Sequence, residues 1–257
     1  MDQAPTIDPV SLRSFGTGLN VAVIGASGGI GGAFAEHLQQ SPDVSQVFRL
    51  SRSGTASEDD GTQTLNIDLE DEASIAKAAD TIRSRAEALS LVIVATGLLH
   101  DGDRLQPEKT WRSLRADVMA RAFRVNTIGP ALVAKHFLPC LTKDRKAAFA
   151  VLSARVGSIA DNRLGGWHAY RASKAALNMI IKTLSVELEQ RNPSALCVAL
   201  HPGTVDTELS RPFQAGVPRG RLFSPGDAAG ALLTVLDGLG PEDSGGFFAW
   251  DGSAIPF

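Results

Sequence analysis

A glycine-rich loop between an apolar strand and a helix constrains this chain more than any other feature of its sequence. The apolar run at 19–24 predicts a buried strand, the loop follows from Gly25 to Gly32, and a helix is expected at 28–40. Glycines let the backbone turn sharply and approach a pyrophosphate closely, and the start of a helix offers free N–H groups. The loop therefore predicts a dinucleotide-binding site; the alternative is a tight glycine turn that binds nothing.

The rest of the chain alternates short apolar strands with helical patterns. Strands are expected at 44–50, 65–67, 91–95, 147–152, 196–200 and 246–249, and helices at 72–89, 111–138 (in two pieces), 169–190 and 226–236. Such alternation predicts a parallel sheet with right-handed crossovers and helices on both faces. We therefore expect an α/β chain: one Rossmann domain with a doubly wound parallel sheet at 19–257, behind a flexible N-terminal arm at 1–18. A length of 257 residues is compatible with one such domain.

Charge and composition exclude several classes of partner. The chain has 25 Lys and Arg against 28 Asp and Glu, a net charge of −3, so no basic excess attracts nucleic acid or an anionic membrane. Cys140 and Cys197 lack the spacing of metal ligands. No apolar run approaches the roughly 18 residues of a membrane span, and the N-terminus lacks the apolar core of a signal peptide. We therefore expect a cytoplasmic protein with no metal, membrane or nucleic-acid partner.

The end of the second strand indicates which dinucleotide the loop would hold. An acidic residue there would bind the ribose hydroxyls of NAD, whereas an arginine would accommodate the 2′-phosphate of NADP. After Leu50 the sequence continues Ser51-Arg52-Ser53, and no Asp or Glu occurs before Glu58. Arg52 therefore favours NADP(H), with a solvated surface arginine as the alternative.

Tyr170 and Lys174 form a second pattern, one that is suited to acid–base chemistry. They lie four positions apart, so on a helix their side chains project from one face. A lysine cation near a phenol favours the phenolate, so we expect Lys174 to lower the pKa of Tyr170 and to make it a general acid or base. The chain has no other tyrosine. Taken alone, the pair could be a chance surface arrangement.

Together, these motifs resemble the short-chain dehydrogenase/reductase family from residue 19 to the C-terminus. The loop matches the family's Gly-x-x-x-Gly-x-Gly, and Tyr170 and Lys174 match its Tyr-x-x-x-Lys. Longer strings at 153–159, 170–178 and 248–252 resemble its C-factor and Sniffer-like carbonyl reductase subgroup. The resemblance implies the catalytic residues Asn126, Ser153, Tyr170 and Lys174. It also implies cofactor contacts at Gly25, Ser27, Gly29, Ile30, Gly31, Arg52, Asp68, Leu69, Ala95, Gly97, Tyr170, Lys174, Pro202, Gly203, Thr204 and Thr207.

The resemblance also implies the chemistry. Hydride would pass between NADP(H) and a small-molecule carbonyl or alcohol, with Tyr170 transferring the proton and Ser153 binding the substrate oxygen. Lys174 would bind the nicotinamide ribose, and Asn126 would hold a water linking Lys174 to solvent. The alternative is a cofactor-binding signalling protein of C-factor type, because that name attaches to cell–cell signalling. By analogy with relatives, a homodimer or homotetramer is expected.

Two departures from the family pattern leave questions open. The family's Asn-Ala-Gly is replaced by Ala95-Thr96-Gly97, which puts local hydrogen bonding in doubt. Ser153 precedes Tyr170 by 17 positions, several more than is typical, so 161–166 is interpreted as a loop insertion. Ser158, 12 positions before Tyr170, is the competing catalytic serine. The segment 207–224 is interpreted as a mobile lid with apolar contacts.

Overall fold

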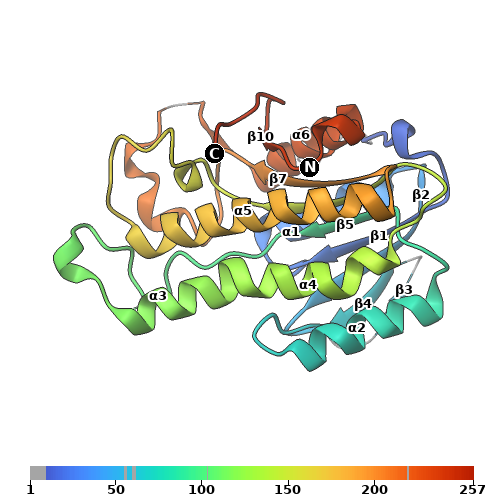
Figure 1. The fold of residues 1–257 in the computed structure, drawn as a ribbon, viewed down its shortest axis with the longest axis horizontal. Helices are drawn as coiled ribbons and strands as arrows, with labels where there is room; N and C mark the ends of the chain where they lie inside the picture. The colour runs from blue at the N-terminus through green and yellow to red at the C-terminus, as the bar shows by residue number, and fades with distance from the viewer. Residues whose placement is uncertain (1–9, 55–56, 60–61, 103, 219) are drawn as a thin grey trace, which may run out of the picture.

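A computed structural model describes residues 10–54, 57–59, 62–102, 104–218 and 220–257 (Figure 1). Their regular elements alternate along the chain as the apolar pattern predicts. The strands are β1 (Leu19–Ile24), β2 (Val44–Ser51), β3 (Ser57–Asp59), β4 (Thr62–Asn66), β5 (Leu91–Val94), β6 (Ala147–Leu152), β7 (Ala195–His201), β8 (Thr204–Val205), β9 (Leu222–Phe223) and β10 (Phe247–Ala249). The α-helices are α1 (Gly29–Gln40), α2 (Glu72–Arg85), α3 (Ala116–Phe123), α4 (Gly129–Phe137), α5 (His168–Arg191) and α6 (Pro225–Gly238).

The main sheet has the strand order β10-β7-β6-β5-β1-β2-β4-β3. Every neighbouring pair in it is parallel except β3 with β4, so the predicted doubly wound parallel sheet is confirmed. The antiparallel edge strand β3 was not predicted. The chain moves outward from β1 in both directions, and a crevice at such a switch point is where open α/β sheets bind ligands, beyond the carboxyl ends of the strands.

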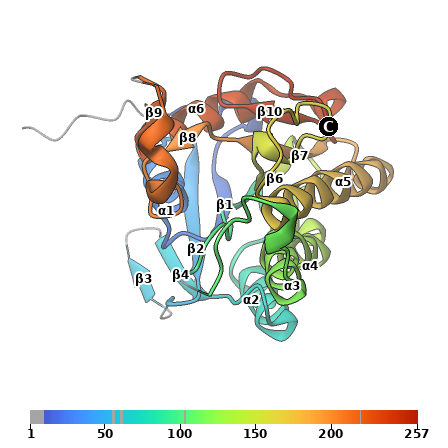
Figure 2. The ribbon, with the colours of Figure 1, turned by 90° about the vertical axis from the view of Figure 1, so that its left-hand side faces the viewer.

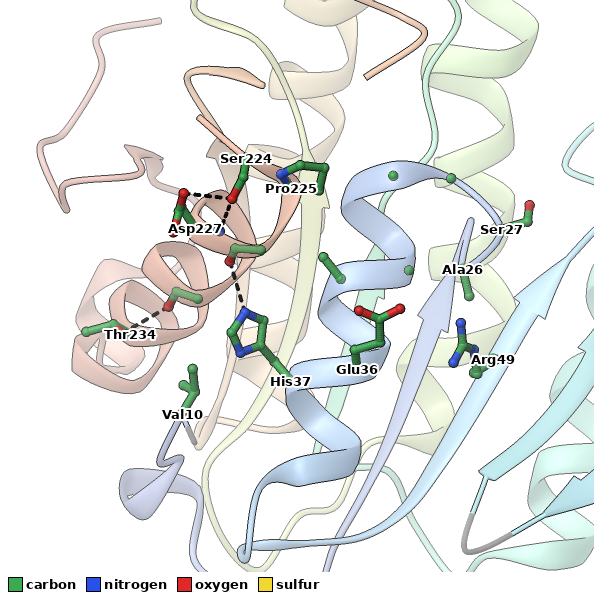
Figure 3. Close-up of a pocket in the computed structure, with 16 residues that line it drawn as sticks. Val10, Ala26, Ser27, Glu36, His37, Arg49, Ser224, Pro225, Asp227 and Thr234 are labelled. Carbon is green, nitrogen blue, oxygen red and sulfur yellow. Dashed lines mark hydrogen bonds between the residues drawn. The ribbon is translucent and has the colours of Figure 1, made fainter. Parts of the chain in front are cut away.

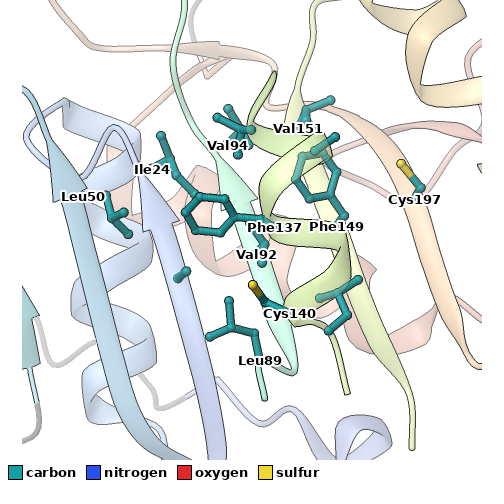
Figure 4. Close-up of a cluster of buried hydrophobic side chains, with 14 of the residues drawn as sticks. Ile24, Leu50, Leu89, Val92, Val94, Phe137, Cys140, Phe149, Val151 and Cys197 are labelled. Carbon is teal, nitrogen blue, oxygen red and sulfur yellow. The ribbon is translucent and has the colours of Figure 1, made fainter. Parts of the chain in front are cut away.

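Helices cover both faces of the sheet (Figure 2). α1 and α6 lie on one face, where buried Phe34 and Leu232 pack with the side chains of alternate strand positions. α2, α4 and α5 lie on the other, where Phe137 of α4 packs among apolar side chains of the central strands (Figure 4). Because the strands are covered on both faces, their sequences are apolar without alternation. Cys140 and Cys197 are free thiols buried within this second cluster.

The segment at 10–18 is part of the folded body, which corrects the expectation of a flexible arm there. Leu12 and Phe15 are buried in the core cluster beneath α1 and α6. The Leu12 N–H donates to a carboxylate oxygen of Asp43 at 2.8 Å, and the Lys146 ammonium lies 4.3 Å from the centroid of the Phe15 ring. Burying two large apolar side chains offsets the entropy of ordering the segment. Residues 1–9 of the expected arm lie outside the described residues.

Candidate active site

The glycine loop is shaped by contacts that exclude side chains. Gly25 has a φ of 90°, and its N–H and that of Ala26 both donate to the Leu50 carbonyl, at 2.8 and 3.1 Å. A Cβ at Gly31 would lie 2.1 Å from the Gly25 carbonyl oxygen, so only glycine lets α1 start this close to β1. Gly28, which precedes the first turn of α1, supplies no side-chain cap. The free N–H groups there suit a diphosphate, so these residues fit a dinucleotide.

The other predicted cofactor residues lie along the carboxyl ends of the strands. Arg52 follows β2 and is exposed, without an ion-pair partner among the described residues, and the Asn66 side chain donates to its carbonyl at 2.7 Å. Asp68 accepts from the Glu70 N–H at 3.0 Å in the turn after β4, and Leu69 beside it is buried. Ile30, on α1, is partly buried. The remaining residues follow β5 or β7 or lie in and just after β8: Ala95, Gly97, Pro202, Gly203, Thr204 and Thr207.

A cleft of about 900 Å³ lies beside the glycine loop and is lined by residues of that loop, of α1, of β2 and of α6 (Figure 3). Ser27, Gly28 and Gly29 are among its lining residues, and so are Glu36 of α1 and Arg49 of β2. Sequence reasoning missed Glu36 and Arg49. The alternation of β2 could have found Arg49, because Phe48 and Leu50 point into the opposite core cluster and leave Arg49 on the α1 side.

Asn126 lies in a π-turn, Arg124–Ile128, that joins α3 to α4. Its side chain is fully buried and forms hydrogen bonds with both backbone groups of Leu98. Oδ1 accepts from the Leu98 N–H at 2.7 Å, and Nδ2 donates to the Leu98 carbonyl at 2.9 Å. Nδ2 also donates to Ser173 Oγ at 3.0 Å, which ties the turn to α5. Such wide turns are frequent at functional sites. The sequence predicted helical material here but not the turn.

Lys174 converges with Asn126 beside Gly97. Lys174 is buried on α5 and its ammonium donates to the Leu152 carbonyl, at the end of β6, at 2.8 Å. A Cβ at Gly97 would lie 3.7 Å from Lys174 Nζ and 3.9 Å from Asn126 Oδ1. Both polar atoms therefore lie close to the Gly97 backbone, and the absence of a side chain there leaves the room between them unfilled. Next to it, Thr96 Oγ1 is buried without a hydrogen-bond partner among the described residues. This unpaired hydroxyl lies in the segment where Ala95-Thr96-Gly97 replaces the family's Asn-Ala-Gly.

The electrostatics of the Tyr170–Lys174 pair differ from the sequence expectation. Burial raises the pKa of Tyr170 to about 12 and lowers the pKa of Lys174 to about 8. The expected lowering of the Tyr170 pKa is therefore wrong for the protein without ligand. Both groups lose hydration, and Lys174 directs its ammonium at a carbonyl while lying 5.9 Å from the Tyr170 ring centroid.

The two candidate serines have different surroundings. Ser153 directly follows β6, its N–H donates to the Leu200 carbonyl at 2.7 Å, and its Oγ donates to Asn178 Oδ1 at 2.7 Å. Ser158 Oγ instead accepts from the Asp161 N–H at 3.1 Å within the loop. Ser153 therefore lies at the carboxyl end of the sheet, where open α/β sheets place their sites, whereas Ser158 belongs to a turn beyond it.

An aromatic wall stands beside Tyr170. Trp167 packs edge-on against Tyr170 with ring centroids 6.3 Å apart, and Phe213 packs against Trp167 at 4.9 Å. Phe213 belongs to the expected lid, which contains a short 3₁₀ helix (Arg211–Gly216) and β9, paired in parallel with β8. At its start the Thr207 methyl group would lie 2.9 Å from a Cβ at Gly29, so Thr207 borders the glycine loop. The segment thus makes apolar contacts through Phe213, as its sequence predicts, and its role as a lid stays a prediction.

Glu108 anchors the start of α5 and was missed from sequence. Its carboxylate accepts from the Ala169 N–H at 3.2 Å, and its carbonyl accepts from the Trp167 N–H. Trp167 has a φ of 51°, a strained value that these contacts help to hold. Because Glu108 lies 61 positions before Ala169, no local signal in the sequence points to it.

A second cleft, of about 860 Å³, lies between the lid and the C-terminal segment, with Gly203, Phe223 and Trp250 among its lining residues. His201 lines it too, and its Nδ1 accepts from the Arg155 N–H at 3.4 Å. Burial, reinforced by the Arg155 charge, lowers the pKa of His201 to about 4. The folded protein therefore holds this imidazole neutral.

His201 should make the fold sensitive to acid. Below pH about 6.5 the unfolded chain takes up a proton that the folded chain refuses until pH about 4, so stability is lost as pH falls through this window. The loss from this group should be about 3 kcal/mol. Urea unfolding at several pH values tests this: His201→Gln should flatten that part of the profile. An unchanged profile in the variant would mean that other groups carry the acid sensitivity.

No helix in the described part of the chain is long and apolar enough to span a membrane. Within the same residues, no group of three or more His, Cys, Asp or Glu side chains could hold a metal ion.

Comparisons with known proteins match this chain along most of its length. The family model described as "short chain dehydrogenase" matches residues 19–217. The protein named C-signal of Myxococcus xanthus is 41% identical over 139 residues, which are 54% of this chain and 78% of that protein. The NADPH-bound carbonyl reductase from chicken fatty liver superposes with a TM-score of 0.80 at 28% identity, over 94% of this chain and 95% of that one. The carbonyl reductase Sniffer of D. melanogaster shares the fold, with a TM-score of 0.78 at 22% identity over 94% and 100% of the two chains.

Proposed function

Because the chain belongs to the short-chain dehydrogenase family, we propose that it is an NADPH-dependent carbonyl reductase. In this proposal a hydride passes between the nicotinamide and a small carbonyl or alcohol compound. The observation that carries the proposal is the convergence of Asn126, Lys174 and Gly97, with Ser153 and Tyr170 beside them, at the strand ends next to the glycine loop. NADPH bound to a carbonyl reductase of the same fold supports the cofactor assignment.

The residues present suit the cofactor. The glycine loop and the start of α1 would hold the diphosphate, Arg52 the 2′-phosphate, and Lys174 the nicotinamide ribose. When bound, the cofactor supplies the hydride, and the protein supplies positioning and electrostatics.

The proton would come from Tyr170. Its raised pKa keeps the phenol protonated at neutral pH, so it can donate to a substrate carbonyl oxygen. Ser153 would donate a hydrogen bond to the same oxygen and stabilise its developing charge. Lys174, whose pKa of about 8 lies near neutrality, can exchange a proton with solvent and replenish Tyr170. Asn126 would hold the water that connects Lys174 to solvent.

The direct test is oxidation of NADPH against aldehydes, ketones, quinones and diketones, with NADH in parallel. Turnover with NADPH supports the proposal, and the best substrate of the panel identifies the compound class. Faster turnover with NADH would overturn the NADP(H) assignment. Tight NADPH binding without turnover of any panel member would favour the second candidate below.

Removing the charge of Arg52 should reduce the preference for NADPH. Charged hydrogen bonds contribute about 1.5–3 kcal/mol, so Arg52→Gln should raise the KM for NADPH about tenfold to a hundredfold and leave that for NADH within about twofold. Steady-state kinetics with both cofactors measures this. Arg49→Gln, within β2 three positions earlier, is the matched control. If Arg49→Gln shows the loss instead, the 2′-phosphate lies in the cleft of Figure 3 and the assignment to Arg52 is wrong.

The second candidate is a cofactor-binding protein with a signalling role. The 41% identity to the protein named C-signal favours it. Such a protein would bind NADP(H) through the same loop, and its biological effect would not require proton transfer. Tyr170→Phe separates the candidates, because a signalling role should survive the substitution and a reductase role should not.

We also propose that the chain is a cytoplasmic homodimer or homotetramer. Ile128, Met179 and Val186 are exposed large apolar side chains along the π-turn and α5. In this proposal these side chains become covered when two copies of the chain associate. Sedimentation equilibrium should give a mass of two or four chains, and a monomer would contradict the proposal.

A further inference from the structure

Ser153 has a partner to which the proposed reaction gives no role. Its Oγ lies 2.7 Å from the side-chain amide of Asn178, one turn of α5 after Lys174. Both residues are deeply buried, Ser153 at 4% and Asn178 at 2% exposure. In the orientation described, Oδ1 accepts the serine proton, and Nδ2 is buried without a hydrogen-bond partner among the described residues. A buried donor left unpaired costs free energy, so this arrangement requires an explanation.

The direction of this hydrogen bond limits what Ser153 can bind. A hydroxyl has one proton and two lone pairs. When its proton goes to Asn178, Ser153 offers only lone pairs to a ligand. A substrate alcohol can donate to those lone pairs, whereas a carbonyl oxygen has no proton to give. Ser153 in this state therefore suits the alcohol and does not bind the carbonyl.

Rotation of the Asn178 side-chain amide by half a turn reverses the direction of its hydrogen bond with Ser153. The oxygen and the amino group are nearly the same size, so the turn needs little extra space. Nδ2 would then donate to Ser153 Oγ, which pairs the buried donor and releases the serine proton toward a carbonyl oxygen. An amide is suited to this because it carries a donor and an acceptor on one rigid group.

From this we infer that Asn178 is a positioning residue that sets the direction of the Ser153 proton: its amide accepts when an alcohol is bound and donates when a carbonyl is bound. The inference rests on the proposed function, because it acts through Ser153 as the residue that binds the substrate oxygen. No atom is exchanged by Asn178 itself; only the hydrogen bond changes direction.

Two substitutions at Asn178 test this. In Asn178→Asp an ionised carboxylate can only accept, so Ser153 cannot donate to the carbonyl, and reduction should fall about a hundredfold, the usual effect of losing one oxyanion donor. Protonating that carboxyl restores a donor, so the ratio of variant to wild-type turnover should rise as pH falls from about 8 to about 5, because burial raises the pKa of the new acid. Asn178→Leu neither donates nor accepts. This variant leaves the serine proton free, so its turnover should fall less than tenfold. The ratio of its turnover to that of the wild type should not change with pH.

Controls separate this role from a merely structural one. Asn192 at the end of α5 is also buried, at 3% exposure, so Asn192→Asp places a carboxylate in the interior away from the site. It should lower stability without changing the pH profile of turnover. A flat pH ratio for Asn178→Asp, or an equal loss in Asn178→Leu, would overturn the inference and leave the proposed function intact. Ser153→Ala with unchanged turnover would instead remove the premise, the proposed role of Ser153.

Discussion

Replacing Tyr170 by phenylalanine should lower carbonyl-dependent NADPH oxidation about a thousandfold and leave the Kd for NADPH within about twofold. The ring keeps its packing against Trp167, and only the hydroxyl is lost. Without a proton donor at the substrate oxygen, hydride arrival would create an unneutralised alkoxide. Stopped-flow turnover and fluorescence titration of NADPH measure the two quantities separately.

The single tyrosine of the chain gives this prediction a spectroscopic check. Absorbance titration of the phenolate reports on Tyr170 alone, with Tyr170→Phe as the blank. For the protein without ligand, the pKa should be about 12, because burial disfavours the phenolate. Turnover that persists in Tyr170→Phe at more than about a tenth of wild type would show that another group supplies the proton.

The second large effect is expected at Gly31, where an alanine Cβ would lie 2.1 Å from the Gly25 carbonyl oxygen. Gly31→Ala must push α1 away from the loop, so we expect a loss of about 3 kcal/mol in the free energy of unfolding. NADPH binding should weaken at least tenfold, because the N–H groups of α1 move with the helix. Urea unfolding and NADPH titration test both effects.

Gly32 provides the matched control, one position further along α1. A Cβ there would have its nearest neighbour, the Ala26 carbonyl oxygen, at 3.4 Å, which is ordinary contact. Gly32→Ala should leave NADPH binding unchanged and stabilise the helix by up to about 1 kcal/mol. If Gly31→Ala binds NADPH like wild type, α1 does not hold the diphosphate.

The sequence predicted most of the fold because its signals are local. Apolar runs marked the central strands, and the β6 boundaries were predicted to the residue. The short edge strand β3 lacks an apolar run, so no pattern in the sequence predicts it. The segment at 10–18 was misjudged because Leu12 and Phe15 stand among polar residues and become core only through contact with distant elements.

In the candidate site, too, local motifs could be predicted from the sequence and long-range contacts could not. Motifs with fixed spacing placed the glycine loop and the Tyr170–Lys174 pair. Contacts across the chain could not be predicted: Asn178 reaches Ser153 across 25 positions, and Glu108 reaches α5 across 61. The direction of the Tyr170 pKa shift also required the structure, because sequence spacing indicates a neighbouring charge but not the loss of hydration.

The π-turn at Arg124–Ile128 has a consequence for how the length of this segment can vary. Its hydrogen bonds span one residue more than those of an α-helix, so the turn stores an insertion of one residue. Each residue of an α-helix advances by about 100°. The wide turn absorbs this rotation, so deleting one residue there would restore a regular helix with α3 and α4 in nearly the same relative orientation. Val118 and Ala122 would then keep their packing with Leu105 and Ala169. The deletion would instead change the turn that carries Asn126, whose side chain is hydrogen-bonded to both backbone groups of Leu98. The extra residue therefore serves the placement of Asn126 and not the packing of either helix.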